Sequence, residues 1–176
     1  DIIDAVSGKK VKRAVKGNRS IEFEELKLLQ PGVSWSPDGK KIVIAAKAGS
    51  KDAFHIIDTR SGDSKKIPFD LEGVFTPKWS PDGMRLAFVG NKNSASDIYT
   101  IDLNTNEIVN LTSDIFSDSE PSWHSSSSKL LFVSDRGTKI DRVPTTAVDM
   151  INHNFEQNNI YSIDINTKVV EKITNS

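Results

Sequence analysis

Three tryptophans recur at a fixed interval, and this interval constrains the fold more than any other feature of the sequence. Trp35, Trp79 and Trp123 stand 44 residues apart. The first two are followed by Ser-Pro-Asp-Gly, in which Pro suits the second position of a type I turn and Gly supplies the positive φ after it. Self-similarity at this period is typical of propellers and solenoids, so the sequence predicts stacked repeats.

The segments after these turns indicate which repeat architecture is present. Residues 42–46 and 86–90 are apolar on both faces, as expected of strands that are covered on both sides. Blades stacked around an axis provide such cover, whereas a two-layer sandwich does not. A third pattern, at 54–62, 98–106 and 160–168, has the alternation and turn residues of an outer hairpin. We therefore predict an all-β propeller built of four-stranded antiparallel blades.

The whole chain is expected to form one propeller segment of three complete repeats plus an outer half-blade. The expected parts are the half-blade at 1–15, a connector at 16–30, blades at 31–74, 75–118 and 119–176, and an insertion near 139–157 in the last blade. An extended connector is favoured over a short helix. Closed propellers typically have four to eight blades. The sequence thus predicts either part of a longer propeller or a subunit whose open blade edges another chain covers.

The third repeat departs from the pattern at its turn. His124-Ser125-Ser126-Ser127 replaces Ser-Pro-Asp-Gly, so the turn lacks its Pro and its Gly. The strand that follows is still apolar. We therefore expect the turn to persist with weaker local encoding.

Composition and charge exclude several classes of partner. Lys and Arg total 23 against 24 for Asp and Glu, so the chain lacks the basic excess of a nucleic-acid-binding surface. No apolar run approaches the roughly 20 residues that span a bilayer. The chain begins with Asp, as expected of a mature product or of a segment of something longer, and its first 16 residues lack a signal peptide's apolar region. Without cysteine it forms no disulfide.

No catalytic motif stands out, so we predict that this chain is not an enzyme. It contains no Gly-x-Ser-x-Gly elbow, no phosphate-binding Gly-x-x-x-x-Gly-Lys-Ser/Thr loop and no His-Glu-x-x-His. Three carboxylates in one loop, Asp114, Asp118 and Glu120, offer the oxygen ligands that Ca²⁺ prefers. Their spacing does not match an EF-hand, and ordinary turn chemistry is the favoured interpretation, so no metal or other cofactor is predicted. Asn18 and Asn110 fit the glycosylation pattern.

These residues resemble a known family. The Trp-Ser-Pro-Asp-Gly-Lys-Lys-Ile segment, the Asp-Ile-Tyr-Thr-Ile-Asp-Leu-Asn-Thr run and the ending Asn110-Leu111-Thr112 are similar to TolB-type repeats, also called PD40 or WD40-like β-propeller repeats. Asp135-Arg136-Gly137 resembles the family's usual strand end, where the Arg either pairs locally or faces a partner. The resemblance implies a bacterial, exported protein in the periplasm or at the cell surface. Such repeats occur in Tol-Pal components, before serine peptidases and in surface proteins, so they do not fix a function.

The expected function is noncatalytic protein interaction or assembly. In the predicted strand order, loops between second and third strands and loops between blades share one face, where a rigid scaffold would present them. The partner, either another protein or further copies of this chain, would use that face or the open blade edges. The candidate contact residues are Asn91, Asn93, Asp114, Asp118, Glu120, Asp135 and Arg136. The alternatives are an accessory propeller of a larger hydrolase or peptidase and a self-associating structural subunit.

Overall fold

The chain forms small antiparallel β-sheets, seen in a computed structural model that describes residues 1–13, 25–26, 32–48, 51–93, 95–137 and 158–174. Within these ranges all regular elements are strands, and no helix is long and apolar enough to cross a membrane. The strands are β1 (Ile2–Ile3), β2 (Lys10–Lys12), β3 (Glu25–Leu26), β4 (Val33–Trp35), β5 (Lys41–Ala48), β6 (Lys51–Asp58), β7 (Ser64–Pro68), β8 (Gly73–Trp79), β9 (Arg85–Lys92), β10 (Ala95–Asp102), β11 (Ile108–Asn110), β12 (Asp118–Trp123), β13 (Lys129–Ser134), β14 (Asn159–Asp164) and β15 (Val170–Lys172).

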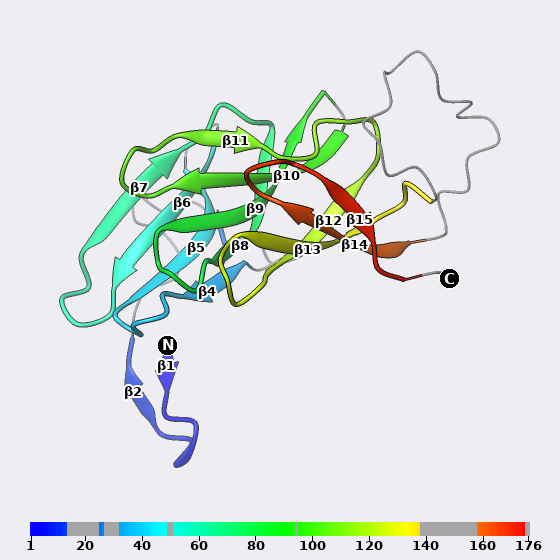
Figure 1. The fold of residues 1–176 in the computed structure, drawn as a ribbon. Helices are drawn as coiled ribbons and strands as arrows, with labels where there is room; N and C mark the ends of the chain where they lie inside the picture. The colour runs from blue at the N-terminus through cyan, green and yellow to red at the C-terminus, as the bar shows by residue number, and fades with distance from the viewer. Residues whose placement is uncertain (14–24, 27–31, 49–50, 94, 138–157, 175–176) are drawn as a thin grey trace.

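Three of the sheets are blades, which confirms the predicted fold class. Strands β4 to β7, β8 to β11 and β12 to β15 each pair in chain order, and the short β3 joins the first sheet by pairing with β5. Figure 1 shows the three sheets following one another, with the β1–β2 hairpin projecting from the first. We call the three sheets blades one, two and three. The predicted connector is extended at β3; its other residues and the insertion from 138 to 157 lie outside the described ranges.

The inner turn of each blade has the same geometry although the third lacks its signature. Gly39 and Gly83 have φ of 69° and 76° in the first two turns, and Ser127 adopts φ 57° in the third. Its hydroxyl accepts a hydrogen bond from the Asp82 amide at 3.0 Å, so the third turn is tied to the second. The predicted persistence of this turn is therefore confirmed, and contact with a neighbouring blade supplies part of what the local sequence lacks.

The outer hairpins share a turn whose last residue has a left-handed backbone, and in blade three this position is taken by a residue type that disfavours that conformation. Gly8 and Gly62 take this position in the half-blade and blade one, Asn106 in blade two (φ 60°) and Lys168 in blade three (φ 58°). A left-handed backbone costs a residue with a Cβ about 1 kcal/mol or more. Relief of this backbone strain in Lys168→Gly should raise the free energy of unfolding by about 0.5–1 kcal/mol, offset in part by loss of the hydrogen bond from Lys168 Nζ to the Asn110 carbonyl at 3.0 Å, and urea denaturation measures the sum. Asn106→Gly is the matched control and should gain less, because Asn tolerates this conformation; equal gains would contradict the explanation.

The same hairpins begin with an aspartate that caps the turn. Asp58, Asp102 and Asp164 each accept hydrogen bonds from the amides two and three residues later, and these bonds lower the pKa of each carboxyl. Because the folded pKa lies below the unfolded value, this stabilisation is present above about pH 4 and is lost as the pH falls through the folded pKa. The melting temperature of the wild-type chain should therefore be higher than that of the Asp102→Ala variant at pH 7. The difference between the two melting temperatures should shrink as the pH is lowered towards 2. A difference that is constant with pH would contradict the capping role.

Adjacent blades pack through two continuous apolar clusters. Between blades one and two, the rings of Phe54, Phe69 and Phe88 meet with centroids 4.7 to 5.1 Å apart, and Tyr99 stacks on Phe88 at 5.5 Å. Between blades two and three the buried side chains are Ala87, Val89, Ile98, Leu111, Leu130, Phe132, Tyr161 and Ile163. Both faces of the blade-two strand β9 are thus covered, as its unbroken apolar run predicted, and the neighbouring strand β10 is covered on both faces as well.

Candidate functional site

On one side of blades two and three, the connecting loops are joined by a hydrogen bond near the strand ends. The β11–β12 loop contacts the end of β13, because the Ser117 amide donates to Asp135 Oδ1 at 2.9 Å. On the opposite side lie the inner turns, where Pro37 of blade one lies 3.4 Å from the position that a Cβ on Gly83 would take. This separation agrees with the predicted sharing of one face by the interblade loops. We call the side that carries the β9–β10 and β11–β12 loops and the end of β13 the loop face.

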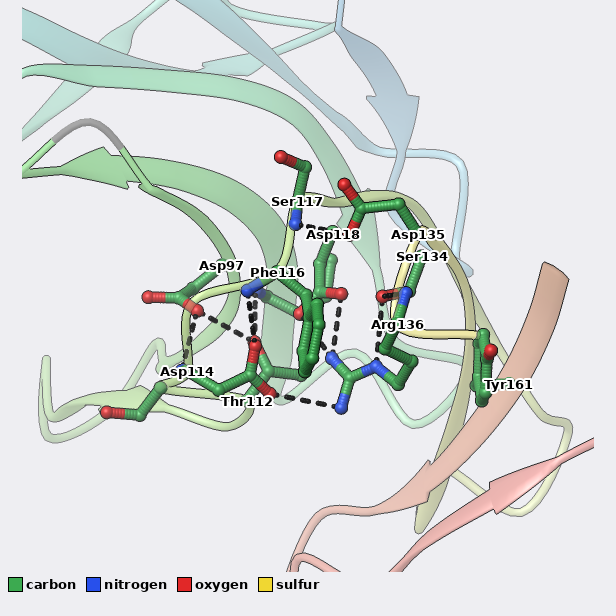
Figure 2. Close-up of polar contacts among 12 residues, drawn as sticks. Asp97, Thr112, Asp114, Phe116, Ser117, Asp118, Ser134, Asp135, Arg136 and Tyr161 are labelled. Carbon is green, nitrogen blue, oxygen red and sulfur yellow. Dashed lines mark hydrogen bonds and ion pairs between the residues drawn. The ribbon is translucent and has the colours of Figure 1, made fainter. Parts of the chain in front are cut away.

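A buried arginine holds the loop face together. The side chain of Arg136 is 1% exposed, and its guanidinium donates to both carboxylate oxygens of Asp118 at 2.8 Å and pairs with Asp114 Oδ2 at 3.0 Å. Its Nε donates to Ser134 Oγ at 2.9 Å. Figure 2 shows Arg136 between the two aspartates and Tyr161. A two-sided pairing of this kind fixes the middle of the β11–β12 loop and the start of β12 relative to the end of β13.

Aromatic rings enclose the same guanidinium. Its central carbon lies 5.1 Å from the ring centroid of Phe132, 5.5 Å from that of Tyr161 and 5.6 Å from that of Phe116. The Tyr161 hydroxyl donates to the carbonyl of Gly137, immediately after Arg136. Ring faces attract a cation, and they exclude the water that would otherwise screen its ion pairs. Arg136 is thus fixed by ion pairs, hydrogen bonds and ring contacts together.

Burial dominates the titration of the two paired carboxyls. It raises the pKa of Asp118 to about 6, and the Arg136 guanidinium acts against this rise. The pKa of Asp114 is also raised, again chiefly by burial, with Arg136 opposing and Asp97 contributing to the rise. The arginine is therefore what allows two carboxylates to stay ionised in the interior near neutral pH.

Next to this cluster lies a polar pocket of about 420 Å³. Its lining residues are Lys92, Asn93, Ala95, Asp97, Tyr99, Asn110, Ser113, Asp114 and Ile115. The buried Asp97 organises the pocket wall, accepting hydrogen bonds from Asn110 Nδ2 at 2.9 Å, Thr112 Oγ1 at 3.2 Å and the Asp114 amide at 3.3 Å. Exposed Asn93 and Ser113 stand at the rim. The pocket offers hydrogen-bond donors and acceptors on a fixed frame, which suits a polar polypeptide segment.

The structure divides the predicted contact residues into two groups. Asn93 and Glu120 are exposed, and Asn91 is half-buried. Asp118, Asp135 and Arg136 are buried at 0%, 5% and 1%, and Asp114 pairs with Arg136, so the prediction that these four contact a partner is corrected. Asp114 and Asp118 pair with Arg136 inside the protein, and Asp135 accepts a hydrogen bond from the Ser117 amide, so all four position the loops.

The structure also shows the surroundings of the residues predicted as candidates for calcium binding and glycosylation. Asp97, Asp114 and Asp118 bring carboxylate oxygens within 4.8 Å of one another, but the Arg136 guanidinium already occupies the place that a cation would take beside two of them. Glu120, the third predicted candidate, is exposed and does not join them. The Asn110 Nδ2 donates to Asp97 Oδ2 at 2.9 Å, so a glycan on that nitrogen would have to fit beside Asp97. Asn18 lies outside the described residues.

Comparison with known proteins is decisive at the level of family. The model of the TolB beta propeller domain, PD40, matches residues 16–143, most of the chain. The chain belongs to the TolB β-propeller family. The family match confirms the resemblance seen in the sequence. The search of curated proteins found no match to the chain.

Solved structures place this TolB-type chain among longer propellers. TolB from Acinetobacter baumannii is similar with a TM-score of 0.64 and 26% identity, over 82% of this chain and 32% of that one. Putative TolB from Agrobacterium tumefaciens has a TM-score of 0.62 and 20% identity, over 83% and 50%. The β-propeller domain of the Trilobed protease from Pyrococcus furiosus has a TM-score of 0.54 and 19% identity, over 85% and 44%. The chain thus spans a third to a half of the length of these structures, and the last two show the fold alone.

Sequence reasoning missed Asp97 in this TolB-type blade pair and left open whether Arg136 pairs locally or faces a partner. Asp97 lies near the start of β10, and Asn159 takes the same place in β14, where Thr174 Oγ1 donates to it at 3.3 Å much as Thr112 donates to Asp97. This recurring pairing of an Asp or Asn with a Thr fifteen residues later was the available signal. Arg136 lies two residues after the end of β13 and precedes Gly137, and this position is compatible with either burial or exposure.

Proposed function

We propose that this TolB-type chain is a noncatalytic protein-interaction module of an exported bacterial protein and that it binds a polypeptide partner through the loop face. The observation that carries the proposal is the buried Arg136 cluster, which holds the loop face in one arrangement before any partner arrives. A preorganised surface loses less conformational entropy on binding than mobile loops do. Burying a cation and two carboxylates costs desolvation free energy, and apolar side chains of similar volume would stabilise the fold as well or better. The cluster is therefore better explained by its effect on the position of the loops.

The surface chemistry of the loop face also supports a polypeptide partner. The pocket beside Asp97 is lined by amide, hydroxyl and carboxylate groups, which can pair with a peptide backbone and polar side chains. The net charge of the chain is −1, so long-range attraction to a polyanion is not expected.

Site-specific photo-crosslinking in cells that produce the protein tests this proposal. A photoreactive residue placed at Asn93 or Ser113, both exposed on the loop face, should give a discrete crosslinked protein species. The matched control is Ser125, which is exposed at an inner turn on the opposite side. Crosslinking of equal yield from Ser125, or none from the loop face, would contradict the proposed binding surface.

The second candidate function is an accessory propeller that serves a hydrolase. It is favoured by the similarity of the fold to propeller-containing proteases such as that of Pyrococcus furiosus. In that case the crosslinked species from Asn93 should react with an active-site serine hydrolase probe, whereas this chain alone should not. Labelling of the chain alone would contradict a noncatalytic role in either form.

A further inference from the structure

Asp97 is a buried carboxylate whose hydrogen bonds come from neutral groups. It is 6% exposed, and its Oδ1 accepts hydrogen bonds from Thr112 Oγ1 and the Asp114 amide, while its Oδ2 accepts one from Asn110 Nδ2. Within the described ranges, no lysine or arginine side chain forms an ion pair with it. A buried charge that lacks a counter-charge is costly, so a cation beside Asp97 would be favourable.

The charged groups nearest to Asp97 do not supply that cation. Carboxylate oxygens of Asp97, Asp114 and Asp118 lie within 4.8 Å of one another. Arg136 pairs with Asp114 and Asp118, so one positive charge faces three negative ones. Figure 2 shows one oxygen of Asp97 turned towards Thr112 and the other pointing away from Arg136. The Arg136 cluster therefore leaves the charge of Asp97 uncompensated.

The polar pocket beside Asp97 gives this carboxylate access to a ligand. Its volume of about 420 Å³ falls in the usual range for ligand pockets, about 300–1,000 Å³. Asp97, Tyr99 and Asn110 line it together. Burial and, after it, the charge of Asp97 raise the pKa of Tyr99, so the phenol stays neutral beside the carboxylate. Because a carboxylate oxygen can accept two hydrogen bonds, Asp97 Oδ2 can accept another besides that from Asn110.

One lysine, Lys92, also lines the pocket, but it is exposed and forms no ion pair with Asp97 in the described part of the chain. Its charge acts on a different carboxyl. The pKa of the exposed Asp70 is lowered chiefly by a hydrogen bond from Lys51, and Lys92 adds to this effect. Lys92 is thus a solvated cation at the edge of the pocket that competes with any cationic ligand.

The repeat shows that the fold does not need a charge at the position of Asp97. The equivalent residues are Ala53 in blade one and Asn159 in blade three. Thr174 Oγ1 donates to Asn159 Oδ1 at 3.3 Å, much as Thr112 Oγ1 donates to Asp97 Oδ1 at 3.2 Å. A neutral residue therefore does the same structural work in blade three, and the carboxylate of blade two calls for another explanation.

We infer that the pocket beside Asp97 takes the cationic side chain of a lysine or arginine of the polypeptide partner, with Asp97 as its counter-charge. An ammonium or guanidinium group in the pocket can donate a charge-assisted hydrogen bond to Asp97 Oδ2, which is stronger than one between neutral groups. Such a ligand turns an uncompensated buried charge into a paired one. The inference rests on the proposed function, because it specifies what the loop face recognises in its partner.

Titration of the whole chain with single capped amino acids tests the pocket without any partner protein. N-acetyl-lysine methylamide or N-acetyl-arginine methylamide is added at matched ionic strength, and the amide resonances of Asn93, Ser113 and Asp114 are followed by NMR. Both should shift these resonances with a dissociation constant of about 1 mM, as expected for ligands of this size. Capped norleucine keeps the aliphatic chain of lysine without its ammonium group. It should bind at least about 10-fold more weakly, and equal binding would overturn the inference.

Two variants of the same pocket sharpen the test. Asp97→Asn places the blade-three residue in blade two and should weaken the binding of capped lysine at least about 10-fold. Lys92→Met should strengthen it, because a competing cation is removed. Unchanged binding in Asp97→Asn, or weaker binding in Lys92→Met, would overturn the inference. The comparison with norleucine uses the wild-type chain, so it decides the question even if Asp97→Asn does not fold.

The same resonances distinguish a metal ion from a basic side chain. Calcium chloride should not reproduce the shifts, and a response to calcium without a response to capped lysine or arginine would overturn the inference. Failure here also differs from failure of the proposed function. A discrete crosslink from the loop face together with no binding of capped lysine or arginine would retain the polypeptide partner and remove only its recognition through a cation.

Discussion

Arg136→Met should be among the most damaging single substitutions in this chain, lowering the free energy of unfolding at pH 7.5 by about 3–5 kcal/mol. Methionine fills much of the space between Phe116, Phe132 and Tyr161, so a cavity is not the main cause. The cause is that Asp114 and Asp118 lose the cation that lies 3.0 and 2.8 Å from them. Because whole domains are stable by only about 5–15 kcal/mol, urea denaturation should register the loss clearly.

The pH dependence of this loss identifies its mechanism. Without the guanidinium, the folded-state pKa values of Asp114 and Asp118 lie further above their unfolded values near 4, so the folded state binds more protons over that window. Stability of the variant should therefore rise as the pH falls from 7.5 to 5. In wild type the same sign applies more weakly, because the pKa of Asp118 is already about 6. A loss that is equal at both pH values would contradict uncompensated charge as the cause.

A matched ion pair occurs one repeat earlier. Asp70 occupies the position of Asp114, and Lys51 Nζ lies 2.6 Å from it, but the Lys51 and Asp70 side chains are 62% and 97% exposed. Lys51→Met should change stability by less than about 1 kcal/mol, because water screens this pair.

A second test removes the charges that Arg136 compensates. Adding Asp114→Asn and Asp118→Asn to the Arg136→Met variant should recover much of the lost free energy of unfolding. Failure to recover it would mean that the arginine stabilises the fold chiefly through packing.

Phe88→Ala should have a comparable effect through a different mechanism, costing about 3–5 kcal/mol. Phe88 is fully buried between blades one and two, with ring centroids 5.1 Å from Phe54, 5.0 Å from Phe69 and 5.5 Å from Tyr99. Truncation leaves a cavity among three rings held on different parts of the chain, so the surroundings cannot collapse easily. Urea denaturation followed by tryptophan fluorescence measures the loss.

The control for Phe88→Ala is Leu131→Ala on the outward face of blade three. Leu131 also lies on the second strand of its blade, but it is 42% exposed. Its truncation should cost about 1 kcal/mol or less, since little apolar surface is removed from burial. Equal costs for the two substitutions would mean that the outer face of blade three is covered in solution by something other than water.

The architecture was predictable because the signals that define it are local and repeated. The 44-residue interval, the Ser-Pro-Asp-Gly turns and the doubly apolar strands each depend on a few neighbouring residues, and together they predicted stacked four-stranded blades. Even the altered turn at Ser127 was expected, because the strand after it kept its apolar run.

The candidate site was less predictable because its central interactions join residues far apart in sequence. A surface position is the usual expectation for Arg136, Asp114 and Asp118, since isolated charges are rarely buried. Only the fold reveals that the three charges meet among aromatic rings. The role of Asp97 likewise depends on Asn110 and Thr112 reaching it from the adjacent part of the blade.

The central claim is that three blades stack through equivalent positions and leave the last such face open. The most direct test is a series of single cysteines at one repeat position, Val43→Cys, Ala87→Cys and Leu131→Cys, labelled in the otherwise unaltered chain. The native side chains at these positions are 0%, 0% and 42% exposed. We expect the Leu131→Cys variant to react at the rate of an exposed thiol and the Val43→Cys and Ala87→Cys variants to react at least about 100-fold more slowly. Equal rates for all three variants, or a protected thiol in Leu131→Cys, would contradict this arrangement of the blades.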